Sequence, residues 1–345
     1  MILAQRANAG GRTAGGTVHY DLMAQYDAVL IVSFGGPENK EDVIPFLENV
    51  LRGRNVPRER MLAVAEHYYH FGGRSPINDY CRELMAALAP QLPLPIYWGN
   101  RNWHPMLADT IRRMERDGVR RAIAIATSAY AGYSGCRQYL EDIDGARQAV
   151  GPGAPEVDKL PPFSAHPLFI EANAGRVANA LERLAAAERG SARLVFTAHS
   201  IPTAMSVTCR YEEQIRNASA AVAARVGRSE WDLAWQSRSG PPQQPWLGPD
   251  ILDHLRALAA GGTRSVVAAP IGFLSDHMEV LYDLDVEAAA VARELGIHFV
   301  RAASAGLHPA MVRMFVELVR ERLEASEAFG ACAPDCCPAP RHGGR

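Results

Sequence analysis

Short apolar runs alternate along the chain with longer stretches of helical periodicity. The runs are AVLIVSF, LPIYWG, RAIAIATS, ARLVFTAHS, DLAWQS, SVVAAPIGF and HFVRAAS. The stretches between them, for example 40–51, 104–118, 168–190 and 286–296, repeat apolar residues at the spacing of amphipathic helices. Continuous apolar strands separated by such helices predict parallel sheets that are covered by helices on both faces.

The alternation occurs twice, which predicts two Rossmann-like α/β lobes with a cleft between them. We expect an N-terminal lobe over 26–165 and a C-terminal lobe over 166–325, although the two halves share no repeat in sequence. Residues 1–25 lack an apolar run of signal-peptide length and are expected to be a disordered leader. Residues 326–345 form a cysteine-rich tail. In such folds the ligand lies beside the carboxyl ends of the strands.

The composition narrows the classes of function. The chain has 345 residues, 48% of them hydrophobic, which is enough for a sizeable core. Its net charge of −2 gives no support to nucleic-acid binding. No run of eighteen apolar residues is present, so stable membrane insertion is not expected. Without a secretion signal, the six cysteines are expected to be free thiols or metal ligands in a cytoplasmic protein.

A histidine ends one of the predicted strands. His199 closes the run RLVFTAH and is followed by Ser200 and, two positions later, by Pro202. Its imidazole should therefore lie at the carboxyl edge of a sheet. A lone histidine at such a place is more often structural than functional, so a chemical role needs a partner.

Three carboxylates on one predicted helix are the candidate partners. Glu279, Asp283 and Glu287 follow one another at intervals of four residues, so they share one stripe of the helix. A solvated acidic face is the simpler interpretation. Like charges at this spacing repel, however, and Arg293 is the only basic residue nearby. A row of oxygen ligands leading toward an imidazole suits the handling of a divalent metal ion.

Aromatic, hydroxyl and arginine side chains gather in loops after the strands of the first half. Together they suit a flat, largely apolar ligand with acidic edges, because aromatic rings can cover its faces and arginine and serine can bind its carboxylates. The simpler interpretation of the three tyrosines is that they pack in the apolar core. The residues concerned are Arg52, Arg54, Arg74, Ser75, Tyr130, Tyr133 and Tyr139, and the proline-rich WQSRSGPPQQPWLGPDI is expected to form a wall of the cleft.

Six separated motifs, in this order, resemble the ferrochelatases, which insert Fe²⁺ into a porphyrin in heme synthesis. They are FGGP, FGGRSPI, YWGNRNWHP, FTAHSIP, WQSRSGPPQQPWLGPDI and GFLSDHMEVLYDLDVE. The resemblance covers roughly residues 26–324 and is closest to the actinobacterial branch. It implies a chelatase-like fold, coproporphyrin III and Fe²⁺ as substrates, coproheme as product, and downstream heme enzymes as transient partners.

The resemblance also implies roles for individual residues. His199 falls on the family's metal-handling histidine and Glu279 on its partner glutamate, so this pair would be catalytic and would bind the incoming Fe²⁺. Asp283 and Glu287 match the family's acidic row, which would relay metal ions or protons. The side from which iron enters stays open.

The resemblance extends to the porphyrin site, with one departure. Ser75 and Tyr139 fall on positions that contact the porphyrin in the family. Some members have a tyrosine that can bind the product iron where this chain has Phe34. A phenylalanine cannot ligate a metal, so that role is absent here or belongs to another group.

A [2Fe–2S] cluster is a further implication of the resemblance. Some members hold one with an internal cysteine and three near the C-terminus. Cys136 matches the internal position, and Cys332, Cys336 and Cys337 can supply the rest. Four thiolates suit such a cluster. Incidental cysteines in a disordered tail are the plainer interpretation, and Cys209 could replace one of the tail ligands.

Three alternatives remain open at this point. A protoporphyrin IX ferrochelatase would have a more apolar entrance to its cleft and would turn over protoporphyrin IX better than coproporphyrin III. A non-catalytic heme or porphyrin carrier would bind the tetrapyrrole but insert no iron. A sirohydrochlorin-type chelatase is typically smaller and lacks the PWLGPDI wall.

Overall fold

A computed structural model describes residues 26–53, 56–240, 243–325 and 336–339. The predicted leader at 1–25 and most of the cysteine-rich tail lie outside the described residues. So do Arg54 and Cys332.

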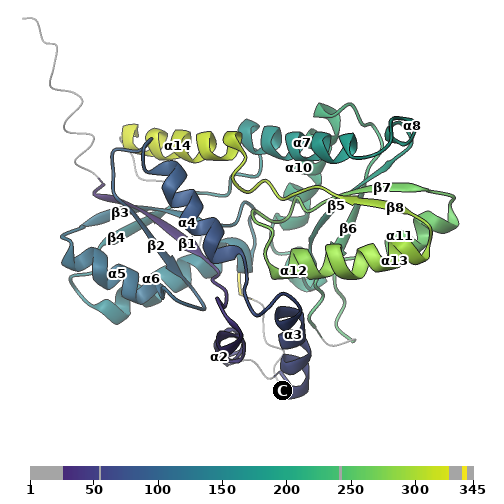
Figure 1. The fold of residues 1–345 in the computed structure, drawn as a ribbon. Coiled ribbons are helices and arrows are strands. Elements are labelled where there is room, and N and C mark those ends of the chain that lie inside the picture. The colour runs from purple at the N-terminus through teal and green to yellow at the C-terminus, as the bar shows by residue number, and fades with distance from the viewer. Residues whose placement is uncertain (1–25, 54–55, 241–242, 326–335, 340–345) are drawn as a thin grey trace, which may run out of the picture.

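Two four-stranded sheets form the framework of the molecule (Figure 1), and every strand pair in them is parallel. The strand order is β2-β1-β3-β4 in the N-terminal lobe and β6-β5-β7-β8 in the C-terminal lobe. This arrangement confirms the predicted fold class. The strands are β1 (Ala28–Ser33), β2 (Ile96–Asn100), β3 (Arg121–Ala126), β4 (Glu156–Lys159), β5 (Arg193–His199), β6 (Asp232–Gln236), β7 (Ser265–Ala269) and β8 (His298–Arg301).

Both sheets follow the same path. The first strand of each lobe is central, the second lies on one side of it, and the third and fourth lie on the other. The direction of the chain across the sheet therefore reverses between the first and third strands, and parallel sheets bind ligands at that switch point. The switch points lie after β1 and β3 in one lobe and after β5 and β7 in the other.

Helices cover both faces of each sheet (Figure 1). Helices α4 and α14 lie on one face of the N-terminal sheet and α5 and α6 on the other, while α7 and α10 face α11 and α13 across the C-terminal sheet. The longer helices are α2 (Lys40–Val50), α3 (Arg58–His70), α4 (Ile77–Leu88), α5 (Leu107–Arg116), α6 (Gln138–Val150), α7 (Pro167–Glu182), α10 (Tyr211–Arg225), α11 (Ile251–Ala260) and α14 (Pro309–Glu324). Shorter elements are η1 (Tyr133–Arg137), α8 (Ala186–Arg189), α9 (Thr203–Ser206), α12 (Met278–Val280), η2 (Leu281–Ala288) and α13 (Ala289–Glu294).

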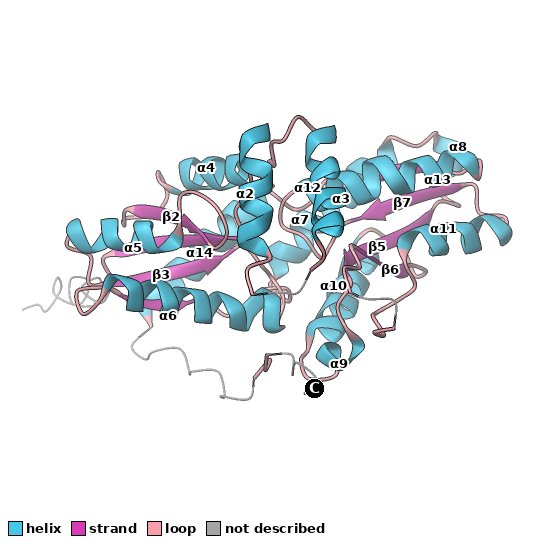
Figure 2. Cartoon of the chain, turned by 90° about the horizontal axis from the view of Figure 1, so that it is seen from below, coloured by secondary structure: helices cyan, strands magenta, loops and turns pink. Residues whose placement is uncertain are grey.

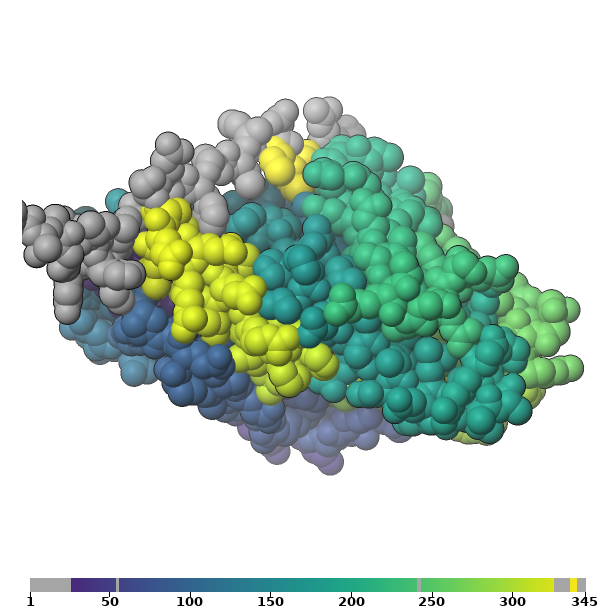
Figure 3. All heavy atoms as spheres, turned by 90° about the horizontal axis from the view of Figure 1, so that it is seen from above, coloured from purple at the N-terminus to yellow at the C-terminus, as the bar shows by residue number. Residues whose placement is uncertain are grey.

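One hydrophobic cluster joins the two lobes. It contains Ile31 and Ile123 from the N-terminal sheet and Phe196 and Val267 from the C-terminal sheet. Helix α14, which ends the C-terminal half, crosses back to pack on α4, β3 and α7, and Figure 3 shows it in yellow between the blue and teal atoms of the two lobes. The proposed boundary at 165/166, just before α7, therefore separates two sheets but not two cores.

Two elements differ from the sequence prediction. Strand β4 has the sequence EVDK and lies at the edge of its sheet, so no apolar run marks it. The helix expected over 168–190 is divided into α7 and α8, and Leu184 is buried at the break. Within the part of the chain that the structure describes, no helix combines the length and apolarity needed to cross a membrane.

Candidate active site

His199 occupies the switch point of the C-terminal lobe, because it is the last residue of β5. Its ring Nδ1 makes a hydrogen bond with the carbonyl oxygen of Ser200. A carbonyl can only accept, so Nδ1 carries the proton of the neutral ring and Nε2 keeps its lone pair. Nε2 lies 3.9 Å from Oε2 of Glu279, and the His199 side chain is 32% exposed. The main chain thus fixes which nitrogen is free to take a proton.

Glu279 reaches this place from the segment that follows β7. The Nδ1 of His277 accepts a hydrogen bond from the backbone N–H of Glu279, which caps α12. One residue earlier, Asp276 accepts hydrogen bonds from Arg301 and from the backbone N–H of Ser304, both at 2.9 Å. Burial lowers the pKa of His277, which favours the neutral ring that this hydrogen bond requires. The backbone of Glu279 is therefore fixed, while its carboxylate stays half exposed.

The next carboxylate of the row, Asp283, is held by the end of β6. Its Oδ2 accepts hydrogen bonds from the hydroxyl of Ser237 and, at 3.2 Å, from Nε2 of Gln236. Ser237 adopts a positive φ of 61°, a conformation that non-glycine residues rarely take and that concentrates at functional sites. Burial raises the pKa of Asp283 to about 7, and the charges of Glu279 and Glu287 add to this rise. The two hydrogen bonds lower the pKa, but their effect is smaller.

Glu287 continues the row on η2. Partial burial raises the pKa of Glu287, and the nearby Asp250 carboxylate raises it further. The structure therefore brings together all four residues that the sequence placed in the catalytic centre, and it adds Asp250 at the far end. Carboxyl groups with raised pKa values keep their protons to a higher pH than ordinary carboxyl groups do.

The N-terminal lobe meets this row through α3. The rings of His67 and Tyr282 stack with their centroids 3.6 Å apart and their planes 9° from parallel, and Figure 2 shows α3 beside α12. Burial lowers the pKa of His67 and the charge of Glu279 opposes that shift, so His67 lies within electrostatic reach of the acidic row. The sequence pattern did not point to either residue, although the run HYYH before FGGRSPI contains His67.

Phe34 and Tyr139 lie near one another at the switch point of the N-terminal lobe. Phe34 directly follows β1 and is 36% exposed, whereas Tyr139 is buried. The guanidinium of Arg101 lies over both rings, 5.7 Å from the centroid of Phe34 and 4.7 Å from that of Tyr139. Asp142 pairs with this guanidinium. The sequence pattern did not point to Arg101 either, although the motif YWGNRNWHP contains it.

Ser75 joins two glycine-rich turns. It is buried, and its backbone N–H donates to the carbonyl of Pro37 at 2.9 Å. A Cβ atom at Gly36 would lie 2.7 Å from the Cβ of Ser75, so the turn after β1 can approach Ser75 only with glycine at that position. The motifs FGGP and FGGRSPI are thus in direct contact.

Three further predicted porphyrin contacts have different surroundings. Tyr130 is buried in the core between Phe169 and Tyr211, and its hydroxyl donates to the carbonyl of Ile271 at 2.8 Å. Only 2% of Tyr130 is exposed. Tyr133 donates to Glu141, and Arg52 is exposed in the turn after α2. Contact of these residues with a porphyrin stays a prediction.

Four of the described cysteines lie in one region, since Cys136, Cys209 and Cys336 all raise the pKa of the Cys337 thiol. Cys136 of η1 and Cys337 of the tail are buried, Cys209 and Cys336 are half-buried, and all four are free thiols. The sulfurs of Cys336 and Cys337 lie 3.8 Å apart. Among the residues with assigned positions, no three His, Cys, Asp or Glu side chains are placed closely enough to hold a metal ion. Cys81, by contrast, is buried in the hydrophobic core of the N-terminal half.

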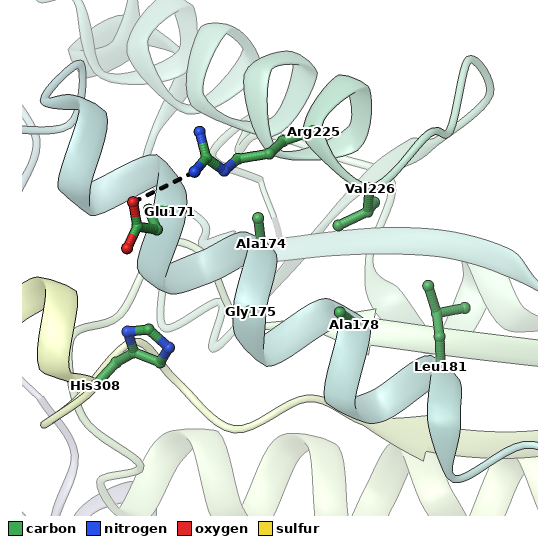
Figure 4. A pocket seen from close by; sticks show the side chains of 8 residues that line it. All are labelled: Glu171, Ala174, Gly175, Ala178, Leu181, Arg225, Val226 and His308. Carbon is green, nitrogen blue, oxygen red and sulfur yellow. Dashed lines mark hydrogen bonds and ion pairs between the residues drawn. The ribbon is translucent and has the colours of Figure 1, made fainter.

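Two surface hollows accompany these features. One, of about 350 Å³, is lined by Ser200, Trp235, Trp246 and Asp250 and adjoins His199 through Ser200. The other, of about 460 Å³, lies over α7 and α10, where Glu171 pairs with Arg225 (Figure 4). It contains no predicted site residue, so we assign it no part in the reaction.

Comparison with known proteins agrees with this geometry. A family model described as Ferrochelatase matches residues 26–323. A Nocardia farcinica protein named Coproporphyrin III ferrochelatase is 51% identical over 342 residues, covering 91% of this chain and 97% of that protein. A Rhodopirellula baltica protein named Ferrochelatase is 53% identical over 328 residues, covering 90% and 93%.

Among solved structures, SirB from Bacillus subtilis with Fe³⁺ has the same fold. Its TM-score is 0.57 over 87% of this chain and 96% of that one, at 11% sequence identity. At that identity the likeness concerns the fold alone. The match of the family model over nearly all described residues is decisive, and this chain belongs to the ferrochelatase family, a family of enzymes.

Proposed function

We propose that this enzyme inserts Fe²⁺ into coproporphyrin III and releases coproheme and two protons. The observation that carries the proposal is the pairing of His199 with Glu279 at a switch point, continued by Asp283 and Glu287. Relatives about half identical to this chain bear the name Coproporphyrin III ferrochelatase, which supports the choice of porphyrin.

The proposed mechanism follows from the free nitrogen of His199. Insertion replaces two pyrrole N–H protons with one Fe²⁺, so the site must accept two protons. Nε2 of His199 can accept a proton because Nδ1 already donates to Ser200, and the imidazolium then pairs with the Glu279 carboxylate 3.9 Å away. Asp283, with a pKa of about 7, can take up or release a proton along the row.

The decisive experiment is an anaerobic insertion assay with Fe²⁺ and two porphyrins, coproporphyrin III and protoporphyrin IX. Because protoporphyrin IX aggregates, detergent must be titrated until both substrates are monomeric. We expect a higher kcat/KM with coproporphyrin III. An equal or higher value with monomeric protoporphyrin IX would assign the enzyme to that substrate instead, and porphyrin binding without insertion would identify a carrier.

We also propose that the protein carries a [2Fe–2S] cluster. The support is the presence of three free thiols, Cys136 in η1 and the adjacent Cys336 and Cys337 in the tail, together with the thiolate chemistry that such clusters use. The sequence offers Cys332 as the fourth ligand. The thiols must draw closer together to hold two irons. A bound cluster would attach the tail to the protein and supply one-electron redox capacity.

The cluster is tested by purifying the protein anaerobically. We expect a red-brown solution with iron and acid-labile sulfide near two each per chain, as a [2Fe–2S] cluster requires. Colourless protein without sulfide, or with one zinc ion per chain, would contradict the proposal.

The free thiols suit a reducing compartment, and we place the enzyme in the cytoplasm.

A further inference from the structure

Two buried asparagines lie beside the glycine turn of the N-terminal lobe. Asn100 is the last residue of β2, is fully buried and pairs in register with Ser33, the last residue of β1. Asn78 lies in the first turn of α4 and is 1% exposed, and Figure 1 shows α4 beside β1 and β2. Burying an amide costs free energy unless its polar atoms are bonded. The hydrogen-bond partners of the two amides therefore indicate what they hold in place.

A directional chain of hydrogen bonds runs through both amides. Nε1 of Trp98, which can only donate, donates to Oδ1 of Asn100 at 2.8 Å. Nδ2 of Asn100 donates to Oδ1 of Asn78 at 3.1 Å, and Nδ2 of Asn78 donates to the carbonyl of Gly36 at 3.1 Å. Both asparagines also donate to the carbonyl of His104, at 3.0 and 3.3 Å. The indole N–H thus fixes the orientation of both amides, and the chain ends on the turn after β1.

A charged pair holds the outer side of this network. Glu38 accepts a further hydrogen bond from Nδ2 of Asn78, at 2.9 Å, and pairs with Arg82. The guanidinium of Arg82 lies over the ring of Trp98, 5.4 Å from its centroid. A buried polar network whose members are all bonded rigidifies the segment that it holds. Apolar side chains of the same shape could fill this space with little loss of stability, so the bonds to the turn set these amides apart from ordinary core residues.

The turn that the network holds connects Phe34 with Ser75. Gly35 has a positive φ of 83°, and a Cβ atom there would lie 2.8 Å from the Cβ of Asn100, so the turn passes directly over this side chain. Phe34 immediately precedes Gly35, and Gly36 contacts Ser75. A shift of the Gly36 carbonyl would therefore move the ring of Phe34 relative to Ser75.

We propose that Asn78 and Asn100 are positioning residues for the porphyrin. Through the carbonyl of Gly36 they hold the turn where Phe34 and Ser75 can bind the macrocycle together. This inference rests on the proposed function, since it takes the turn as part of the porphyrin site. Because both amides act through the turn, their loss should weaken porphyrin binding and leave the chemical step nearly unchanged.

The test uses Asn78→Leu, Asn100→Leu and the double variant, since leucine is similar in size and has no hydrogen-bonding group. Binding of coproporphyrin III is measured by fluorescence titration, and kcat and KM by anaerobic kinetics. We expect Kd and KM to rise about tenfold in each single variant, whereas kcat changes less than about threefold. Because both amides belong to one chain, the Kd of the double variant should stay within about twofold of that of the weaker single variant.

Tyr97→Phe is the matched control. Tyr97 lies on the same strand and donates to Asp117 at 2.8 Å, on the face of the sheet that α5 covers. This substitution removes one hydrogen bond of β2 and should leave Kd unchanged. Trp98→Phe covers the case in which the asparagine variants do not fold. It removes only the N–H that orients Asn100 and should raise Kd at least about twofold.

The outcomes separate the positioning role from the proposed function. A Kd within about twofold of the wild-type value in both folded asparagine variants, or a loss confined to kcat, would overturn the positioning role. Single effects that multiply in the double variant would do the same, because the two amides would then act separately. If neither asparagine variant folds, an unchanged Kd in Trp98→Phe would overturn the role. Binding of coproporphyrin III by the wild type without iron insertion would instead overturn the proposed function alone.

Discussion

At the scale of single residues, the catalytic proposal depends on one nitrogen atom. His199 donates through Nδ1 to the backbone and presents Nε2 toward Glu279. The sequence predicted this pair because a strand ended in histidine and a distant helix carried a row of carboxylates. It could not predict the tautomer, since the hydrogen bond to Ser200 depends on how the backbone turns after β5.

Replacing His199 by alanine should abolish most of the activity. Because general acid–base groups contribute about 10²–10⁴-fold, we expect kcat to fall by at least about 100-fold while porphyrin binding stays within a few-fold. The measurements are anaerobic steady-state kinetics and a fluorescence titration with porphyrin. A suitable control is His298→Ala, since His298 is exposed and pairs with Glu188 away from the site. Turnover near that of wild type would remove His199 from the mechanism.

Asp283 should lower the free energy of unfolding as the pH rises, whereas most paired carboxylates raise it. Its pKa is raised from 3.8 to about 7, so the folded protein favours the protonated form. Its contribution to stability is therefore complete below about pH 4 and is lost as the pH rises through 7. At about pH 8, Asp283→Asn should be more stable than wild type by on the order of 1–3 kcal/mol, less than the full shift implies because the side chain is partly exposed.

Urea unfolding of both proteins tests this expectation. The advantage of Asp283→Asn should shrink as the pH falls from about 8 to about 4. If the difference in unfolding free energy between the two proteins is the same at both pH values, Asp283 does not titrate near neutrality. Asp285→Asn is the matched control, because Asp285 lies on the same element and pairs with Arg301 away from the row.

At the scale of elements, the contact between α3 and η2 joins the N-terminal lobe to the acidic row. Tyr282 stacks on His67, and stacked rings contribute about 0.5–1.5 kcal/mol beyond burial. We expect Tyr282→Leu to loosen this contact and to raise KM for the porphyrin about 2–10-fold, with a smaller change in kcat. Tyr282→Phe retains the stacked ring and should keep KM within about twofold. Equal effects of both substitutions would attribute the role to the hydroxyl group rather than to stacking.

The sequence predicted the elements better than the contacts between them. Seven strands carried an apolar signal, whereas β4 did not, because an edge strand with one exposed side needs no apolar run. The stacking of His67 on Tyr282 and the place of Arg101 over Tyr139 join segments far apart in sequence. No local pattern determines such contacts, so they required the structure.

At the scale of the whole molecule, the two lobes share one core. The sequence predicted two lobes from the repeated alternation, but it gave no sign that α14 would return to the first one. Phe315 of α14 is fully buried and packs edge-to-face on Phe163, with 5.3 Å between the ring centroids. The lobes should therefore unfold together.

Phe315→Ala tests this joint core. Removing a buried phenylalanine ring typically costs about 3–5 kcal/mol, so we expect a loss of that size in the free energy of unfolding. Differential scanning calorimetry should show one transition in both proteins, at a lower temperature in the variant. Two separated transitions in the variant, with only one of them shifted, would show that the lobes unfold independently.

The two lobes share one strand order, but their switch points carry different kinds of residues. In the C-terminal lobe the switch point carries the imidazole and leads to the acidic row, whereas in the N-terminal lobe it carries Phe34 and a glycine turn. Under the proposed function, residues in one half of the chain would contact the tetrapyrrole and residues in the other half would move protons. Substitutions in the first half would then change the preferred tetrapyrrole and leave the proton chemistry of the second half intact.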